Sequence, residues 1–183
     1  MKRTLLKLLL GLALLPLAVQ AGDLTSDRDS TAFNGRWRMD TARSTALDGW
    51  STADLVISTD GSKINFRHDM IWHATKVTAT NTVDTAQPTE ITNFFRIDQR
   101  HMAVYARPKE AAHVQATWLD EGRTLRLEAQ VPVETSQGNT TMRLYDEYRL
   151  LDDGELELIE LHSTRDRPLV YYFTKVPEET AKK

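Results

Sequence analysis

The 183-residue sequence contains no cysteine. Disulfide bonds, thiol catalysis and thiolate metal sites are therefore excluded, and the fold must be stabilised by the packing of its core. The five histidines also lack the H-x-H, H-x-x-x-H and H-E-x-x-H spacings of common metal sites. No G-x-S-x-G sequence of a serine hydrolase is present. These absences predict a protein without a metal or other cofactor.

Only one long hydrophobic run occurs, over residues 8–17. It spans about ten residues, whereas a membrane-spanning helix needs about 20. Lys2 and Arg3 precede the run and small residues up to Ala21 follow it, as in a secretory signal peptide. We therefore expect residues 1–21 to be cleaved after Ala21, leaving a periplasmic or secreted protein without a membrane anchor.

The mature chain has an excess of acidic residues. The whole sequence has 23 Lys and Arg against 26 Asp and Glu, and three of the basic residues lie within the first 21. The remaining 162 residues therefore carry 20 basic and 26 acidic side chains, a net charge of −6. This charge disfavours nucleic acid and anionic lipid as partners, and the length suits a single domain.

Between residues 33 and 177, apolar and polar side chains alternate as in half-buried β-strands. In the first such stretch, Trp37 and Met39 share one face while Arg36 and Arg38 share the other. Residues 22–32 and 178–183 lack this pattern, which predicts a flexible leader and a flexible tail around the domain. The expected strands cover residues 33–39, 53–59, 62–72, 74–83, 89–97, 101–107, 112–119, 123–131, 140–151, 154–163 and 168–176.

Turn sequences at residues 59–62, 120–122 and 152–154 suit tight hairpins between these strands. Consecutive hairpins favour an all-β fold, an antiparallel up-and-down β-barrel of about 8–10 strands, because closure removes exposed strand edges. A β-sandwich or a curved open sheet would satisfy the same alternation. An outer-membrane barrel is a further alternative, but the chain ends in Ala-Lys-Lys and lacks a terminal aromatic residue.

The stretch Gly35-Arg36-Trp37 resembles the G-x-W signature of lipocalins and the wider calycin group. Its continuation through Asp40, Arg43 and Ser44, with the ending over residues 171–177, is similar to lipocalin-like domains of exported bacterial proteins. The resemblance covers residues 33–177. It implies that Trp37 closes the bottom of a barrel and that a basic residue covers its ring, with Lys175 as the candidate and Arg165 or Arg167 as alternatives.

Several aromatic and polar side chains are expected to face the barrel interior. His68 shares a strand face with Phe66, and Asp146 shares one with Tyr148. An unpartnered buried polar group costs about 1–3 kcal/mol, so these two should be hydrogen-bonded or should face a cavity. The resemblance suggests that the loop over residues 41–52, which carries Trp50, covers the barrel mouth. The predicted ligand-binding residues are Trp50, Phe66, His68, Met70, Trp72, Trp118 and Tyr148.

These features favour a protein that binds a small hydrophobic or amphipathic molecule inside the barrel. One alternative is a cell-envelope module that binds another protein through its outer face. A second alternative is a cyclase, isomerase or hydratase type of enzyme that uses the same pocket. In that case, Asp146 and His68 are the candidate proton carriers. The sequence leaves the oligomeric state open.

Overall fold

The computed structural model of the protein describes residues 30–45 and 50–177. The predicted signal peptide, most of the predicted leader, the tail beyond residue 177 and part of the first loop lie outside the described residues. None of the helices that are described is long and apolar enough to cross a membrane. The elements are η1 (Ser30–Phe33), β1 (Gly35–Met39), β2 (Thr52–Asp60), β3 (Lys63–Trp72), β4 (Thr75–Asp84), β5 (Thr89–Thr92), α1 (Gln99–Met102), β6 (Tyr105–Ala106), β7 (Ala111–Leu119), η2 (Asp120–Gly122), β8 (Thr124–Thr135), β9 (Gly138–Leu150), β10 (Leu156–His162) and β11 (Leu169–Val176).

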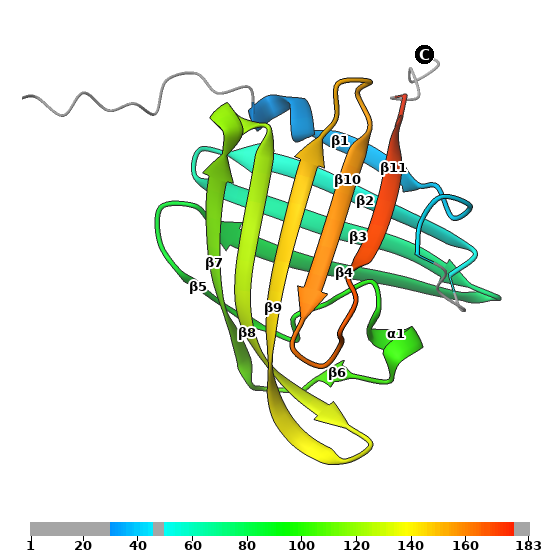
Figure 1. The fold of residues 1–183 in the computed structure, drawn as a ribbon, viewed down its shortest axis with the longest axis vertical. Coiled ribbons are helices and arrows are strands. Elements are labelled where there is room, and N and C mark those ends of the chain that lie inside the picture. Colours follow the sequence, from blue (N-terminus) through cyan, green and yellow to red (C-terminus); the bar gives the residue numbers. More distant parts are fainter. Residues whose placement is uncertain (1–29, 46–49, 178–183) are drawn as a thin grey trace, which may run out of the picture.

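The strands form one antiparallel meander that curls into a barrel (Figure 1). Their order is β4-β3-β2-β1-β11-β10-β9-β8-β7-β5, and β6 pairs with β8 beside this path. The first and last strands, β1 and β11, pair with each other. The ends of the path, β4 and β5, share no ladder in the described chain, although the Asp84 N–H donates to Thr89 Oγ1 at 3.0 Å. The predicted all-β, up-and-down, lipocalin-like barrel is therefore confirmed, in a nearly closed form.

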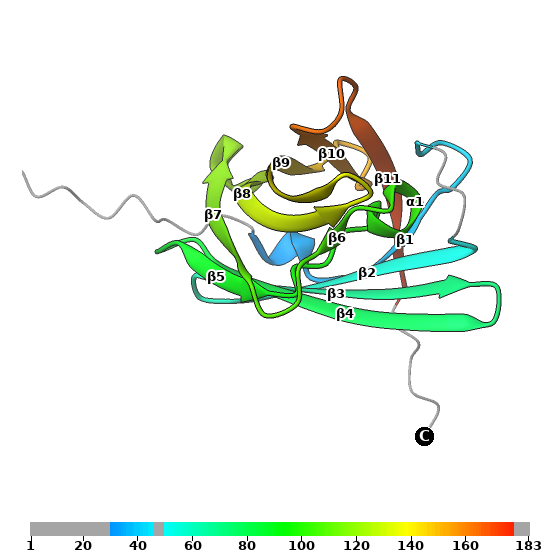
Figure 2. The ribbon, with the colours of Figure 1, turned by 90° about the horizontal axis from the view of Figure 1, so that it is seen from below.

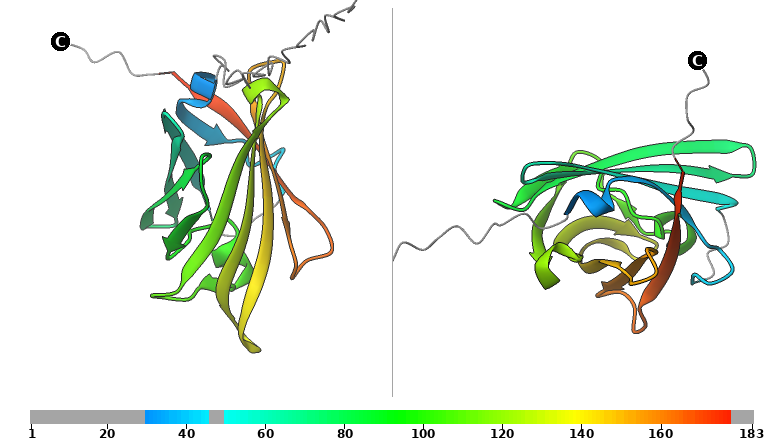
Figure 3. Two further views of the ribbon diagram at one scale, coloured as in Figure 1. Left: turned by 90° about the vertical axis from the view of Figure 1, so that its left-hand side faces the viewer. Right: turned by 90° about the horizontal axis from the view of Figure 1, so that it is seen from above.

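The barrel is flattened into two layers whose strands cross steeply. In Figures 1 and 2, β2, β3 and β4 form one layer, and β7, β8, β9 and β10 form the other. The short helix η1 lies between the layers at one end (Figure 3), and α1 lies at the opposite end. We call these the η1 end and the α1 end of the barrel.

The alternation of the sequence sets which side chains fill the interior. On β3, Ile64, Phe66, His68 and Met70 are buried between more exposed neighbours. The same pattern holds on β8 and β9, where every second residue is buried over most of the strand. The large apolar side chains thus point inward, which is the reverse of their arrangement in an outer-membrane barrel.

Trp37 closes the η1 end, as the G-x-W resemblance implies. Its side chain is 1% exposed, and its Nε1–H donates to the Phe33 carbonyl oxygen at 2.7 Å. The Lys175 ammonium lies 5.0 Å from the centre of the indole ring and donates to the Ala32 carbonyl oxygen. Gly35 has a φ of +124°, and a Cβ at this position would lie 3.1 Å from Lys175 Cε. The glycine therefore leaves room for the lysine that covers the tryptophan.

Two of the expected strands are wrong in part. The strand expected over residues 89–97 ends at Thr92, and the one expected over residues 101–107 is replaced by α1 and the two-residue strand β6. Asn93 and Ala103 adopt positive φ values of 55° and 51°, which turn the chain out of the sheet at both points. The segment between them enters the barrel instead of extending its wall.

Trp37→Ala should lower the free energy of unfolding by about 3–5 kcal/mol, because it empties a fully buried site. Lys175→Ala should lower it by less than about 1 kcal/mol, since a cation–π contact at an exposed position is weak. Urea unfolding followed by circular dichroism measures both changes. Equal losses in the two variants would contradict this account of the η1 end.

The outer face of β8 and β9 carries an ionic cluster centred on Glu147. This side chain is largely buried, which raises the pKa of its carboxyl. Hydrogen bonds from Tyr145, Arg149 and Arg126 more than offset this effect and lower the pKa from 4.5 to about 2. The charged form is thus stabilised by folding.

The stabilising contribution of Glu147 should be complete above its ordinary pKa of 4.5 and should disappear as the pH falls toward about 2. The wild-type free energy of unfolding should therefore decrease over this interval. In Glu147→Gln the decrease should be smaller. Urea unfolding at a series of pH values tests this, and an identical pH dependence in the two proteins would refute it.

Candidate functional site

Residues 93–104, which we call the plug, enter the barrel near its α1 end, where residues 94–98 fill the interior and α1 follows with no buried residue. Phe94, Phe95, Arg96, Ile97 and Asp98 are all buried. They face inward-pointing residues of β3 and β4 on one side and of β8, β9 and β10 on the other. The plug forms no ladder with the sheet in the described chain, which rejoins the sheet only after residue 104, through β6. It is therefore a segment packed inside the barrel rather than part of the wall.

Few polar contacts attach the plug to the wall. The Asn81 side chain donates to the Phe95 carbonyl oxygen at 2.7 Å and accepts the Phe95 N–H at 3.1 Å. The Trp50 Nε1–H donates to the Ile97 carbonyl oxygen at 2.8 Å. The ring of His68 packs against that of Phe95, with 5.0 Å between their centres. Residues of β3, β4 and the first loop thus hold the plug backbone.

A second contact lies where the plug leaves the barrel. The Arg100 guanidinium on α1 stacks on Trp72, 3.6 Å from the ring centre. Trp50 lies further away, with its ring centre 6.0 Å from the same guanidinium. The two tryptophans therefore line the α1 end, beside the helix at which the plug leaves the interior.

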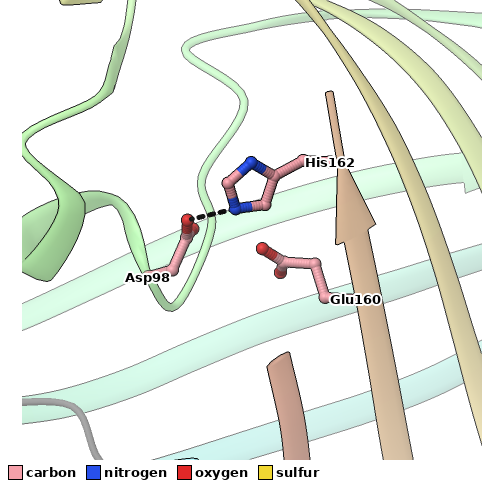
Figure 4. Close-up of side chains that lie close together, drawn as sticks. All are labelled: Asp98, Glu160 and His162. Atoms are coloured by element: carbon pink, nitrogen blue, oxygen red, sulfur yellow. Dashed lines mark ion pairs between the residues drawn. The ribbon is translucent and has the colours of Figure 1, made fainter. Parts of the chain in front are cut away.

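A cluster of buried ionisable side chains lies where the plug meets the wall, and we call it the polar cluster. It consists of Arg96 and Asp98 of the plug and of Asp146, Glu160 and His162 of the wall. Arg96 Nε donates to Asp98 Oδ1 at 3.0 Å. Asp98 Oδ2 faces His162 Nε2 at 3.6 Å, with the Glu160 carboxyl beside them (Figure 4). Asp146 and Glu160 are paired positions on β9 and β10, so both side chains enter the interior at one level.

Burial changes the protonation of this cluster. It raises the pKa of Asp146 and of Glu160 well above the usual range, and the nearby Asp98 carboxylate adds to both shifts. Burial lowers the pKa of His162 although Asp98 opposes that shift. Burial therefore favours the neutral forms of Asp146, Glu160 and His162.

Many polar atoms around the plug have no hydrogen-bond partner. Native proteins leave few such atoms, because each costs about 1–3 kcal/mol. This concentration in one region marks the α1 half of the interior as the candidate site. The unpartnered atoms around the plug are His68 Nδ1, Arg96 Nη1, Asp98 Oδ2, Asp146 Oδ1, Glu160 Oε1, His162 Nε2 and Tyr171 Oη.

A cavity of about 10 Å³ remains between the plug and the walls. This volume accommodates about one water molecule. Its polar lining includes His68, Asn81, Arg96, Asp146 and Glu160. With the plug in place, this cavity is therefore too small for any larger molecule.

The structure brings most of the predicted ligand-binding residues together. Phe66, His68 and Tyr148 line the cavity, and the rings of Phe66 and Tyr148 stack 4.9 Å apart. Met70 is buried on the same strand, and Trp50 and Trp72 lie at the α1 end.

Trp118 lies apart from them. Its ring packs 5.1 Å from that of Phe33, whose carbonyl oxygen accepts the hydrogen bond from Trp37 at the η1 end. The structure therefore places this predicted ligand-binding residue at the end of the barrel opposite the plug.

The two candidate proton carriers, Asp146 and His68, line the same cavity. Burial lowers the pKa of His68 to about 4, whereas the pKa of Asp146 is raised well above its usual value. At neutral pH the histidine is thus an unprotonated ring, and the raised pKa of Asp146 favours its neutral, proton-donating form. This pair can hydrogen-bond an uncharged polar group.

Sequence reasoning missed Asn81 and most of the polar cluster. Glu160 and His162 were within reach, because they continue the inward face of Leu156 and Leu158 on β10. Arg96 and Asp98 carried no such signal. Arg96 and Asp98 enter the interior because the chain turns at Asn93. This turn depends on the tertiary packing of the plug, which the sequence pattern does not show.

No protein-family model matches the chain, and no curated protein matches it. Among solved structures, a secretory abundant heat soluble protein of Ramazzottius varieornatus is 14% identical, with 79% of this chain and 96% of that chain covered and a TM-score of 0.49. Secretory abundant heat soluble protein 4 of the same organism is 10% identical, with 80% and 96% covered and a TM-score of 0.46. The fatty-acid-binding protein of Manduca sexta is 10% identical, with 68% and 73% covered and a TM-score of 0.38.

Asn81→Ala should lower the free energy of unfolding by about 1–3 kcal/mol, because it leaves the buried N–H and C=O of Phe95 without partners. Asn65→Ala on the exposed face of β3 is the matched control and should change it by less than about 0.5 kcal/mol. Urea unfolding measures both. Equal stabilities of the two variants would show that Asn81 does not hold the plug.

Proposed function

We propose that the protein is an exported binding protein that takes one small hydrophobic or amphipathic molecule into the barrel, in the space that the plug now fills. One observation carries the proposal: the plug places Phe94, Phe95 and Ile97 inside the barrel without a ladder to either wall. Export is proposed from the signal-peptide pattern of residues 1–21.

The plug can be exchanged for a ligand at a moderate cost in free energy. Its backbone is tied to the wall by the two hydrogen bonds of Asn81 and the one of Trp50. Each contributes about 0.5–1.5 kcal/mol net. The burial of the apolar side chains of the plug contributes more, and an apolar ligand in the same space restores this contribution at about 25 cal/mol per Å².

The walls that the plug contacts indicate the ligand chemistry. Phe66, Leu127 and Leu158 offer an apolar surface. The unprotonated His68 ring, whose pKa burial lowers to about 4, and the Tyr148 hydroxyl, whose pKa burial raises well above 10, offer uncharged hydrogen-bonding groups. A molecule with an apolar body and one uncharged polar end, such as a hydroxyl, matches both parts.

The alternative role as a protein-interaction module has one supporting feature. A hollow runs along the seam between β4 and β5, where neither strand edge meets the other in a ladder. Unpaired strand edges can accept an added strand from another chain. The interior accounts for more of the unusual features of the molecule, so ligand binding is preferred.

Delipidated protein should bind 1-dodecanol saturably, at one molecule per chain, with a Kd below about 100 µM. Asn81→Ala should bind about tenfold more tightly than wild type, because less free energy is needed to displace the plug. Asn65→Ala should match wild type. Tryptophan fluorescence and equilibrium dialysis report the binding, and dodecanoate serves as the charged comparison.

Two results would contradict the proposal. One is the absence of saturable binding to wild type and to Asn81→Ala alike. The other is equal affinity in Asn81→Ala and Asn65→Ala, which would place the alcohol at a surface that the plug does not control.

A further inference from the structure

Three side chains of the polar cluster converge on one point between the plug and the wall. Asp98 belongs to the plug, while Glu160 and His162 lie two residues apart on β10 (Figure 4). One ligand atom from each residue lies within 4.8 Å of the other two. The side chains of Asp98 and His162 are each 1% exposed, and the Glu160 residue is 2% exposed.

The atoms that face this point make no hydrogen bond to the protein. Asp98 Oδ2, Glu160 Oε1 and His162 Nε2 are all buried without a hydrogen-bond partner, and Asp98 Oδ2 lies 3.6 Å from His162 Nε2, the spacing of a long ion pair. The other oxygen of Asp98 is occupied by Arg96, which fixes the carboxylate with Oδ2 toward the histidine. The surrounding protein therefore orients these ligand atoms toward one another.

His162 has a partner on its second ring nitrogen. His162 Nδ1 lies 2.6 Å from Thr164 Oγ1, and this hydroxyl oxygen accepts the proton of Nδ1–H in the tautomer whose Nε2 lone pair is free to bind a metal. In this tautomer the lone pair of Nε2 is directed at Asp98. Metal-bound histidines are commonly oriented by a hydrogen bond of this kind from the second ring nitrogen.

We propose that Asp98, Glu160 and His162 form a binding site for a divalent transition-metal ion, with Zn²⁺ as the best fit. Two oxygens and one imidazole nitrogen are ligands that Zn²⁺ accepts, and an open fourth position can take water. Ligands about 2.0–2.2 Å from a tetrahedral ion lie about 3.4 Å apart. The 3.6 Å between Asp98 Oδ2 and His162 Nε2 matches this spacing, and rotation of the Glu160 side chain closes the third side.

Charge balance supports a divalent ion. The cluster holds the carboxyl groups of Asp98, Glu160 and Asp146, against one buried guanidinium on Arg96. Carboxyl groups therefore outnumber buried cationic groups in the cluster, and a bound divalent cation favours their ionised forms. Arg165 is the other nearby cation, and it is only partly buried at the edge of the cluster. The ion would link the plug to the wall, so the site requires the plug in place and does not itself require an apolar ligand.

The test titrates the EDTA-treated, dialysed protein with ZnCl₂ by isothermal calorimetry. Wild type should bind one Zn²⁺ per chain with a Kd below about 1 µM, and its Tm should rise with the ion present. Mg²⁺ and Ca²⁺, which prefer all-oxygen sites, should not compete at equal concentration. Glu160→Gln and His162→Gln should weaken Zn²⁺ binding at least about 100-fold.

Two further variants keep the test decisive if the buried ones fail to fold. Thr164→Val removes the partner of His162 Nδ1 at an exposed residue and should weaken Zn²⁺ binding about tenfold. His113→Gln removes the exposed His113–Glu90 pair and should leave binding unchanged. In wild type, NMR of the imidazole nitrogens should show Zn²⁺ shifting His162 Nε2.

The proposal is overturned by any of three results. Wild type binds no Zn²⁺; or Thr164→Val and every folded variant of the cluster bind it as wild type does; or His113→Gln abolishes binding. The last result would assign the ion to the protein surface.

Discussion

The space inside a barrel of this size has to be filled, and this chain fills it with its own backbone. A wall of ten strands encloses more volume than its inward side chains occupy at the α1 end. The plug supplies the missing volume with Phe94, Phe95 and Ile97. It also carries Arg96 and Asp98 into the interior, where they complete the polar cluster with Asp146, Glu160 and His162 of the wall.

The two ends of the barrel are built for different purposes. The η1 end is closed by Trp37, whose polar atom is paired and whose face is covered by Lys175. The α1 end concentrates buried polar atoms without partners. The paired groups at the η1 end contribute stability, whereas the unsatisfied groups at the α1 end retain free energy that a ligand or an ion can release on binding.

The wall of the barrel was predictable because a strand shows its inward face at every second residue. This rule identified the buried faces of β3, β8 and β9, and the same alternation on β10 extends to Glu160 and His162. The plug was not predictable in this way, because the sequence of its apolar residues resembles that of a buried strand. The structure departs from a strand at Asn93, whose positive φ turns the chain out of the sheet. Asp98 lies 62 residues before Glu160 in the sequence and joins it only through the position of the plug. A search for metal-binding sequences therefore misses a site whose third ligand is supplied by tertiary structure.

The central claim is that the plug is a separable occupant of the barrel. Native-state hydrogen exchange of the wild-type chain at increasing urea tests it most directly. The account predicts that the Phe95 amide, bonded to Asn81, exchanges through a local opening with a lower free energy than amides of β8 and β9 and with little dependence on urea. If the Phe95 amide instead exchanges with the free energy and urea dependence of global unfolding, the plug is an integral part of the core and the account is contradicted.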